Sequence, residues 1–203
     1  KLWEAVLHGA NSVHPQVKST GRDGFELYNK LGYVPCDKLS QSVARTLEYA
    51  YNDWCIYTMG KALGRPEKEI KIYAKRAMNY RNVFDPSLNL MRGKDSNGKF
   101  ETPFNPTDWG RSFTEGDTWH WTWCVFHDPQ GLVDLMGGRD NFIHMMDSTF
   151  IVPPVAKESM IHEEREMQVM NMGQYAHGNQ PIQHMIYLYN YVAQPWKAQY
   201  WLR

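Results

Sequence analysis

Apolar side chains recur at steps of three and four residues along most of the chain, which is the spacing of one face of an α-helix. The clearest example follows Ser40, a residue type that often caps the start of a helix. In the sequence after it, Val43, Leu47 and Ala50 fall on one face. Gly64 is expected to end this helix, so the pattern predicts a helix of about twenty residues.

The same spacing predicts further helices. They are expected over residues 1–11, 66–80, 114–125, 129–136 and 140–150, with two more after Pro181 and Pro195. Residues 22–37 and the long polar stretch 84–113 are predicted to be loops, and a connection as long as the second is usually functional. Residues 151–172 give no clear pattern and are a candidate specificity loop. The charged run at 163–166 within them is typical of a solvated face.

Strand signals are almost absent, so the fold class is predicted to be all-α. Helix pairs joined by alternating short and long loops favour part of an (α/α)6 toroid, in which helical hairpins surround a central cavity. Too few helices are predicted for the complete ring of twelve, so this piece is expected to leave apolar faces uncovered. The chain also begins with residues typical of the middle of a helix, which suggests a fragment.

Composition excludes several functions. The chain has 22 basic and 22 acidic residues, so no net charge favours nucleic acid or an anionic membrane. No apolar run is long enough to span a membrane. Three scattered cysteines predict neither a zinc site nor a disulfide framework. Aromatic residues make up 14% of the sequence, which is typical of a packed core or of a site where flat rings stack on sugars.

The segment from Thr114 to Trp123 is dense in groups suited to sugars, because carboxylates accept hydrogen bonds from hydroxyl groups. The simpler interpretation is a helix start, with Thr114 as N-cap, Glu115 and Asp117 in the first turn, and tryptophans in the core. Both interpretations stay open. On a helix, Trp119 and Trp123 would share one face.

Two further groups of polar residues precede predicted helices. His127 and Asp128 form either a hydrogen-bonded pair or a helix cap, and the proline after Asp128 favours the cap. His177 and His184 flank Gln180, with no recognised metal-binding spacing. The amides of Asn179 and Gln183 offer oxygens of the kind that calcium accepts, although this alone is weak evidence for a calcium site.

Several blocks of sequence carry a stronger signal together. They are Gly32–Pro35, Thr46–Cys55, Asn82–Pro86, Met91–Gly93, Thr114–Gly116, His127–Leu132, Gln174–Pro181 and Gln194–Lys197. Jointly they resemble the calcium-dependent exo-α-mannosidases of glycoside hydrolase family 92. This resemblance implies that residues 1–203 are a fragment of a single (α/α)6 catalytic domain. It also implies that an N-terminal β-sandwich and the C-terminal part of the barrel are absent, and that this missing remainder packs against the fragment.

The resemblance also implies roles for individual residues. An inverting glycosidase uses an acid and a base about 6.5–9.5 Å apart. In most of the family the acid is the glutamate of His-Gly-Asn-Glu-Pro, and Gln180 stands at that position here. The family's base motif does not occur in the chain, so the fragment alone is expected to be inactive. Calcium is the implied cofactor, with Gln183 as a ligand through its backbone oxygen. The candidate substrate-binding residues are Glu115, Trp119, His127, Asp128, His177, Asn179 and His184.

The amide of Gln180 narrows the predicted chemistry. An amide is not a proton donor for a leaving sugar, whereas a phosphate leaves as a stable anion without one. The sequence therefore predicts an inverting exo-α-mannosidase that hydrolyses mannose-1-phospho-6-mannose linkages. The alternatives are an α-1,2-mannosidase with another proton source and an inactive mannose-binding module. The expected partner is a mannose-containing glycan or mannosyl phosphodiester, and the expected location is secreted or periplasmic, in a bacterium.

Overall fold

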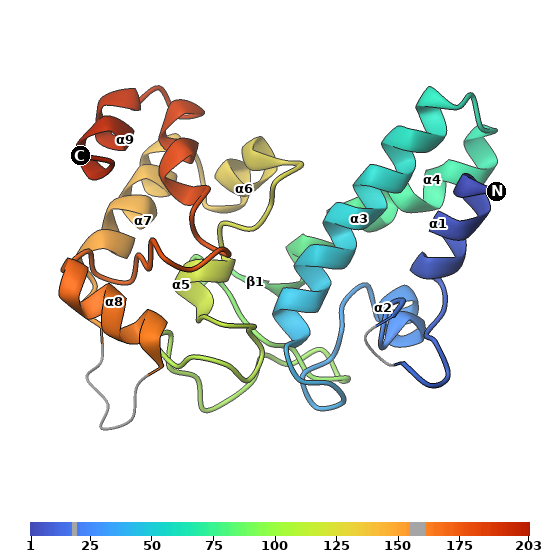
Figure 1. Ribbon diagram of the computed structural model, residues 1–203, viewed down its shortest axis with the longest axis horizontal. Helices are drawn as coiled ribbons and strands as arrows, with labels where there is room; N and C mark the ends of the chain where they lie inside the picture. Colours follow the sequence, from blue (N-terminus) through green and yellow to red (C-terminus); the bar gives the residue numbers. More distant parts are fainter. Residues whose placement is uncertain (18–19, 155–160) are drawn as a thin grey trace. The chain divides into compact units, whose positions relative to one another are not determined.

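The computed structural model describes residues 1–17, 20–154 and 161–203, which form two compact units (Figure 1). The first unit comprises Lys1–Val83 and Arg92–Thr102, and the second comprises Phe84–Met91 and Pro103–Arg203. Both are mainly helical, as the sequence predicted. Short antiparallel strands, β1 (Phe84–Asp85) and β2 (Leu90–Met91), interrupt the stretch that was expected to be a loop throughout.

Helices also make up most of the first unit. They are α1 (Leu2–Ala10), α2 (Phe25–Leu31), α3 (Ser42–Ala62), α4 (Glu67–Arg76) and the 3-10 helix η1 (Ala77–Val83). The prediction of a loop over residues 22–37 is therefore wrong at its centre. Gly24 and Gly32 bracket α2 with φ of 77° and 79°, and these left-handed positions start and stop a short helix that carries little periodicity. The long helix begins after Gln41, one residue later than expected.

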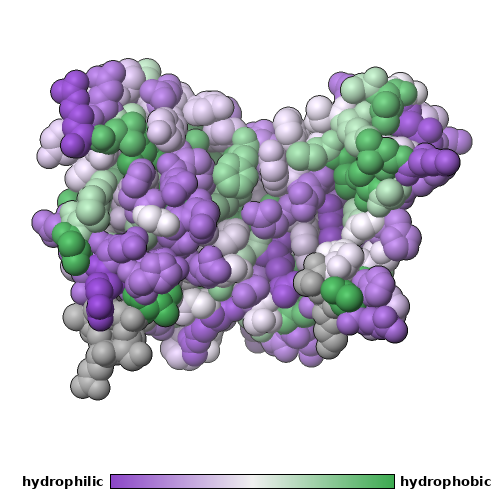
Figure 2. Space-filling model, viewed as in Figure 1, coloured by the Kyte–Doolittle hydropathy of each residue, from purple (hydrophilic) through white to green (hydrophobic). Residues whose placement is uncertain are grey.

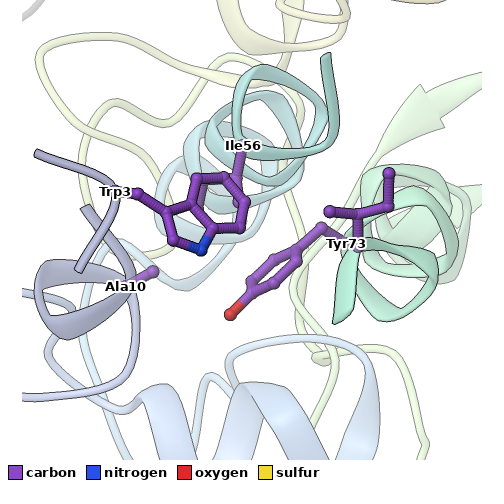
Figure 3. Packing of buried hydrophobic residues seen from close by; sticks show 5 residues of the cluster. Trp3, Ala10, Ile56 and Tyr73 are labelled. Carbon is purple, nitrogen blue, oxygen red and sulfur yellow. The ribbon is translucent and has the colours of Figure 1, made fainter. Parts of the chain in front are cut away.

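The core of the first unit lies where α1, α3 and α4 meet. Trp3 of α1, Ile56 of α3 and Tyr73 of α4 are buried against one another, with Ala10 closing the end of α1 (Figure 3). Side chains from three helices thus share one apolar cluster. Burying each large apolar side chain contributes about 1.5–3 kcal/mol, so this cluster accounts for the antiparallel packing of α3 on α4 that their short connection predicted.

A buried ion pair also lies in the first unit, one helical turn along α3 from Ile56 of this cluster. The guanidinium of Arg22 donates to Asp53 Oδ1 at 2.7 Å, and the Tyr28 hydroxyl donates to Oδ2 at 3.1 Å. The Arg22 and Asp53 side chains are almost fully removed from solvent. Burial raises the pKa of the Asp53 carboxyl, against the opposing effect of Arg22. The interaction therefore ties the segment before α2 to the middle of α3, and each partner compensates the other's lost hydration.

The second unit contains the segments with candidate chemistry. Besides β1 and β2 its elements are α5 (Thr118–Trp121), α6 (Pro129–Leu135), α7 (Arg139–Ile151), α8 (His162–Met170), the 3-10 helix η2 (Met185–Asn190) and α9 (Pro195–Trp201). The predicted helices at 129–136, 140–150 and after Pro195 are confirmed within one or two residues. The helix expected directly after Pro181 is replaced by turns and by η2.

Aromatic rings join α7, η2 and α9. Phe150 at the end of α7 stacks on Trp201 of α9, with ring centroids 4.0 Å apart and planes 7° from parallel. It also contacts Tyr175 at 5.2 Å and Tyr189 at 6.5 Å. Gly173 (φ 61°) crosses the end of α7 so closely that a Cβ would overlap the Phe150 backbone. The chain can therefore pass from α8 toward residue 177 only with glycine at this point.

Apolar surface remains exposed on both units, as expected for a piece of a larger domain. Figure 2 shows apolar surface over α1 and α4, and Leu2, Leu63 and Ile72 are among the exposed apolar side chains of the first unit. None of the helices in the described parts of the chain is long and apolar enough to cross a membrane.

The charged run within 151–172 is only partly a solvated face. Glu164 of α8 is buried while its neighbours Arg165 and Glu166 are exposed. Residues 155–160 of the candidate specificity loop lie outside the described residues. The rest of that segment contains α8, so part of a region that gave no clear pattern is a helix of nine residues.

Candidate functional site

A buried carboxylate starts the short helix α5. Asp117 Oδ1 accepts hydrogen bonds from the backbone N–H groups of Trp119 (2.8 Å) and His120 (3.3 Å), and it lies 2.7 Å from His120 Nδ1. Asp117 is therefore the N-cap, and the prediction of Thr114 as cap of a helix reaching Val125 is wrong. Glu115 has φ of 46°, which a helix cannot contain, so the helix begins only after this left-handed residue.

The tryptophans of this segment are mainly core residues. Trp119, Trp121 and Trp123 are 8%, 6% and 1% exposed. Trp121 donates from Nε1 to the Thr114 carbonyl at 2.7 Å, and Trp123 meets Phe142 edge to face at 5.4 Å. Trp119 Nε1 is buried with no hydrogen-bond partner in the described parts of the chain. A role for Trp119 in binding sugar stays a prediction.

Asp128 caps α6, as the following proline indicated. Its Oδ1 accepts from the Gly131 N–H at 2.9 Å, and Pro129 occupies the first turn. His127 is half-buried in the preceding turn. The cap interpretation is thus confirmed for Asp128. Binding of substrate by His127 and Asp128 stays a prediction.

The loop that carries Gln180 is fixed to the α5 segment, although the two are about sixty residues apart in sequence. Three hydrogen bonds join them. The Asn179 amide donates to the Glu115 carbonyl, the Cys124 thiol donates to the Pro181 carbonyl at 3.2 Å, and His184 Nε2 bonds the Trp123 carbonyl at 2.7 Å. The structure therefore brings together four of the sequence-predicted site residues: Glu115, Asn179, Gln180 and His184.

Gln180 itself faces solvent at the centre of this fixed loop. Asn179 before it is buried, whereas Gln180 is exposed. No hydrogen bond within the described residues involves the Gln180 side chain. Its amide is thus available to a ligand, and the backbone that carries it is held on both sides.

His177 and Gln183 are both exposed and linked through the backbone. The His177 carbonyl accepts a hydrogen bond from Gln183 Nε2 at 3.1 Å, and His177 Nδ1 lies 2.9 Å from the Tyr175 hydroxyl. Burial raises the pKa of Tyr175, so its hydroxyl keeps its proton. When that hydroxyl donates to Nδ1, His177 carries its own proton on Nε2 and can donate it to a ligand.

His184 is largely enclosed, between Phe126 and the Trp123 carbonyl. Its ring centroid lies 4.5 Å from that of Phe126. Burial lowers the pKa of His184, and the hydrogen bond to the Trp123 carbonyl opposes this shift. The neutral imidazole is therefore favoured, with Nε2–H donating to that carbonyl. His184 thus fixes the loop to the α5 segment through the Trp123 carbonyl, and this enclosed contact suits a structural role better than sugar binding.

This environment predicts a loss of stability in acid. A histidine whose pKa is lowered in the folded state is neutral in both states above about pH 6.5, and below that value only the unfolded chain takes up the proton. The free energy of unfolding of the whole enzyme should thus fall as the pH drops below 6.5. His184 contributes at most about 1.4 kcal/mol per pH unit. The measurement is urea unfolding between pH 7.5 and 5.5, compared with His184→Gln.

The Gln variant keeps a neutral donor for the Trp123 carbonyl but does not titrate. It should therefore show a smaller dependence of stability on pH than the parent enzyme. Parallel curves for the two proteins would contradict the assignment, because His184 is the only residue in which they differ.

The profile of the glycosyl hydrolase family 92 catalytic domain matches residues 1–203. The chain belongs to glycoside hydrolase family 92. The catalytic domain of this family is an (α/α)6 toroid. All 203 residues of this mainly helical chain match part of that domain.

Solved structures agree with this assignment. An inverting family 92 mannosidase from Bacteroides thetaiotaomicron is 50% identical, with a TM-score of 0.85, over 98% of this chain and 27% of its own. A family 92 α-mannosidase from the same bacterium, solved with mannoimidazole, is 36% identical, with a TM-score of 0.83, over 98% of this chain and 26% of its own.

A protein from the fungus Arthroderma benhamiae described as an uncharacterized secreted glycosidase is 26% identical, over 95% of this chain and 26% of its own length. The chain thus spans about a quarter of the length of each of these three relatives.

Sequence reasoning did not predict one contact of the loop that carries Gln180. The Glu166 carboxylate of α8 lies so close to Gly178 that a Cβ there would overlap Glu166 Oε2. The glycine was visible in the sequence, but the partner was not, because α8 and the loop meet only through the tertiary fold. Glu166 was instead counted as part of a solvated charged run.

Proposed function

We propose that the whole enzyme containing this chain is an inverting exo-α-mannosidase that hydrolyses mannose joined through C1 to a phosphate, as in mannose-1-phospho-6-mannose. Gln180 is the observation that carries this proposal. It stands exposed at the position of the family's general acid, on a loop held at both sides. The names of the two bacterial relatives, both mannosidases, support the choice of sugar.

The identity of the leaving group decides whether Gln180 suffices. Loss of a general acid typically costs about 10²–10⁴-fold in rate when a sugar alkoxide must leave. A phosphomonoester has a second pKa of about 6, so it leaves as a stable anion. Water attacks C1, the C1–O bond breaks, and the oxygen keeps the electron pair without receiving a proton. The base that takes the proton of the water is expected outside residues 1–203.

Two donors on the loop suit an anionic phosphate. The Gln180 amide offers N–H groups and carries no charge, so it does not repel the phosphate as a glutamate would. His177 offers Nε2–H when the Tyr175 hydroxyl bonds its Nδ1. Both side chains are exposed and lie three residues apart. We therefore assign Gln180 and His177 to binding the leaving phosphate.

Calcium is part of the proposal because family 92 implies it. In the described residues no three His, Cys, Asp or Glu side chains come together as a metal site. Calcium also accepts neutral amide and backbone oxygens, and exposed Gln183 offers both beside His177. Gln183 is therefore the candidate ligand that this chain offers. When bound, the ion would contact hydroxyl groups of the mannose and help to distort its ring.

Substrate preference tests the proposal directly. The whole enzyme, with calcium, should release mannose from mannose-1-phospho-6-mannose at least about 100-fold more efficiently than from α-1,2-mannobiose, because only the second needs a donated proton. Mannose release at matched concentrations measures both. Equal or better cleavage of mannobiose would contradict the proposal. Binding of mannose without turnover of either substrate would indicate a binding module instead.

One observation favours a second function, an α-1,2-mannosidase with a different acid. The Glu166 carboxylate lies against Gly178, two residues before Gln180. If it donates the proton, the Glu166→Gln enzyme loses about 10²–10⁴-fold in kcat on mannobiose. If the phosphodiester proposal holds, kcat on mannose-1-phospho-6-mannose is unchanged in this variant.

A secreted or periplasmic location in a bacterium forms part of the same proposal. The fungal relative is described as a secreted glycosidase, and mannose-containing glycans are substrates found outside the cytoplasm.

A further inference from the structure

Tyr175 and His177 form a pair in which one side chain is buried and the other is exposed. The Tyr175 ring is fully removed from solvent, whereas His177 faces solvent two residues further along the loop. The Tyr175 hydroxyl lies 2.9 Å from His177 Nδ1, and the ring centroids lie 5.7 Å apart. The exposed imidazole is thus connected to the interior of the second unit.

The second unit holds Tyr175 in place from two sides. Its ring packs on Phe150 at the end of α7, and Phe150 stacks in turn on Trp201 of α9. The backbone is fixed as well, because the Gln174 N–H donates to the Thr149 carbonyl at 2.7 Å. The Tyr175 hydroxyl therefore has little freedom to move away from His177.

The direction of this hydrogen bond follows from the burial of the hydroxyl. In the parts of the chain that the structure describes, His177 Nδ1 is the only hydrogen-bond partner of the Tyr175 hydroxyl. Burial raises the pKa of Tyr175, so the hydroxyl keeps its hydrogen. If His177 Nδ1 also carried a hydrogen, the buried hydroxyl hydrogen would have no acceptor, which is costly. Nδ1 therefore accepts, and the hydrogen of the imidazole lies on Nε2.

This arrangement determines what His177 can offer to a ligand. Tyr175 occupies Nδ1, so Nε2–H is the polar group left for the exposed side of the ring. A neutral imidazole N–H donates a hydrogen bond without readily giving up its proton. An oxygen of a leaving phosphate needs such a hydrogen bond and no proton. An imidazolium could replace the acid that is missing at Gln180, but it would deprive the Tyr175 hydroxyl of its acceptor.

We propose that Tyr175 is a positioning residue, whose hydroxyl holds the His177 ring with Nε2–H available to the leaving phosphate. This rests on the proposed function, in which Gln180 and His177 bind that phosphate. An exposed side chain that rotates freely loses this freedom when it binds a ligand. The bond from Tyr175 restricts the ring beforehand and so removes part of that cost. Because Tyr175 is buried, it acts only through His177.

A double-mutant cycle tests the proposal. The whole enzyme, with calcium, is compared with Tyr175→Phe, His177→Ala and the double variant on mannose-1-phospho-6-mannose. Tyr175→Phe keeps the ring and removes the hydroxyl, so kcat/KM should fall about fivefold, the usual contribution of one side-chain hydrogen bond. In the His177→Ala enzyme, which has already lost the donor, the same change should alter kcat/KM by less than about twofold. Equal losses in the two backgrounds would overturn the proposal, and so would an unchanged kcat/KM in Tyr175→Phe.

Tyr189→Phe is the matched control, because it removes a buried hydroxyl from the same group of aromatic rings. Tyr189 also contacts Phe150, and its hydroxyl donates to Asp147 at 2.7 Å. None of its contacts among the described residues involves His177. This variant should keep kcat/KM within about twofold of the parent value. A loss equal to that of Tyr175→Phe would mean that the packing of the rings, rather than the bond to His177, sets the activity, and would overturn the proposal.

The two proposals fail separately. If the parent enzyme hydrolyses α-1,2-mannobiose and no mannosyl phosphodiester, the proposed function is wrong, and the cycle is repeated with mannobiose. A loss in Tyr175→Phe that disappears in the His177→Ala background would still support the positioning of His177 at the leaving group. Equal losses in both backgrounds would overturn it.

Discussion

Gln180→Glu should raise kcat/KM of the whole enzyme on α-1,2-mannobiose by about 10²–10⁴-fold, the usual contribution of a general acid. The same change should lower activity on mannose-1-phospho-6-mannose, because a carboxylate at this point repels the leaving phosphate. The cause is the group at the end of the side chain, because a carboxylic acid has a proton that it can transfer and a neutral amide does not. The change in substrate preference is measured as mannose release from both substrates by the parent enzyme and the variant over a range of pH.

The pH profile gives the sharper result. Activity of the variant on mannobiose should decline at high pH as the new carboxyl ionises, and the parent enzyme should lack that limb. Gln180→Ala serves as the control, since it removes the amide without adding an acid. A gain on mannobiose in the alanine variant, or none in the glutamate variant, would show that Gln180 does not select the leaving group.

Asp53→Ala should be the most destabilising single change among the polar residues of the first unit. It leaves the Arg22 guanidinium buried without its partner, 2.7 Å from where the carboxylate was. Breaking a buried pair in this way typically costs about 3–5 kcal/mol. The free energy of unfolding of the whole enzyme, from urea titration, measures this loss.

The chain offers a matched exposed pair for comparison. Arg65 and Glu69 lie 2.8 Å apart near the start of α4, with both side chains partly exposed. Glu69→Ala should cost no more than about 1 kcal/mol, because solvent screens the pair. Similar losses in Asp53→Ala and Glu69→Ala would mean that the buried pair contributes no more than a surface contact.

Local pattern predicted the long elements well. The apolar face of Val43, Leu47 and Ala50 indicated α3 within two residues at each end, and the Asp128–Pro129 pair indicated the start of α6. These features depend on neighbours within one helical turn, so the sequence contains them directly.

The short elements of the site were predicted less well. Residues 114–125 read as one helix because their composition fits a helix, whereas the left-handed Glu115 and the Asp117 side chain delay its start to Thr118. After Pro181 the chain forms turns instead of a helix, since the Pro181 carbonyl and the His184 side chain bond groups of the α5 segment. Contacts between residues about sixty positions apart produce no local sequence pattern, so the turns after Pro181 could not be predicted.

The anchors of the loop that carries Gln180 also bear on how such an enzyme can evolve. The groups that receive the loop's hydrogen bonds on the α5 segment are the backbone carbonyls of Glu115 and Trp123. Every residue has a carbonyl, so substitutions in that segment can leave these two anchors in place, whereas the third depends on the Cys124 thiol. Among the described residues, the Gln180 side chain between them makes no hydrogen bond that an exchange would lose. Under the proposed function, an ancestor could therefore exchange acid for amide at this position, and so change substrate, with little loss of stability.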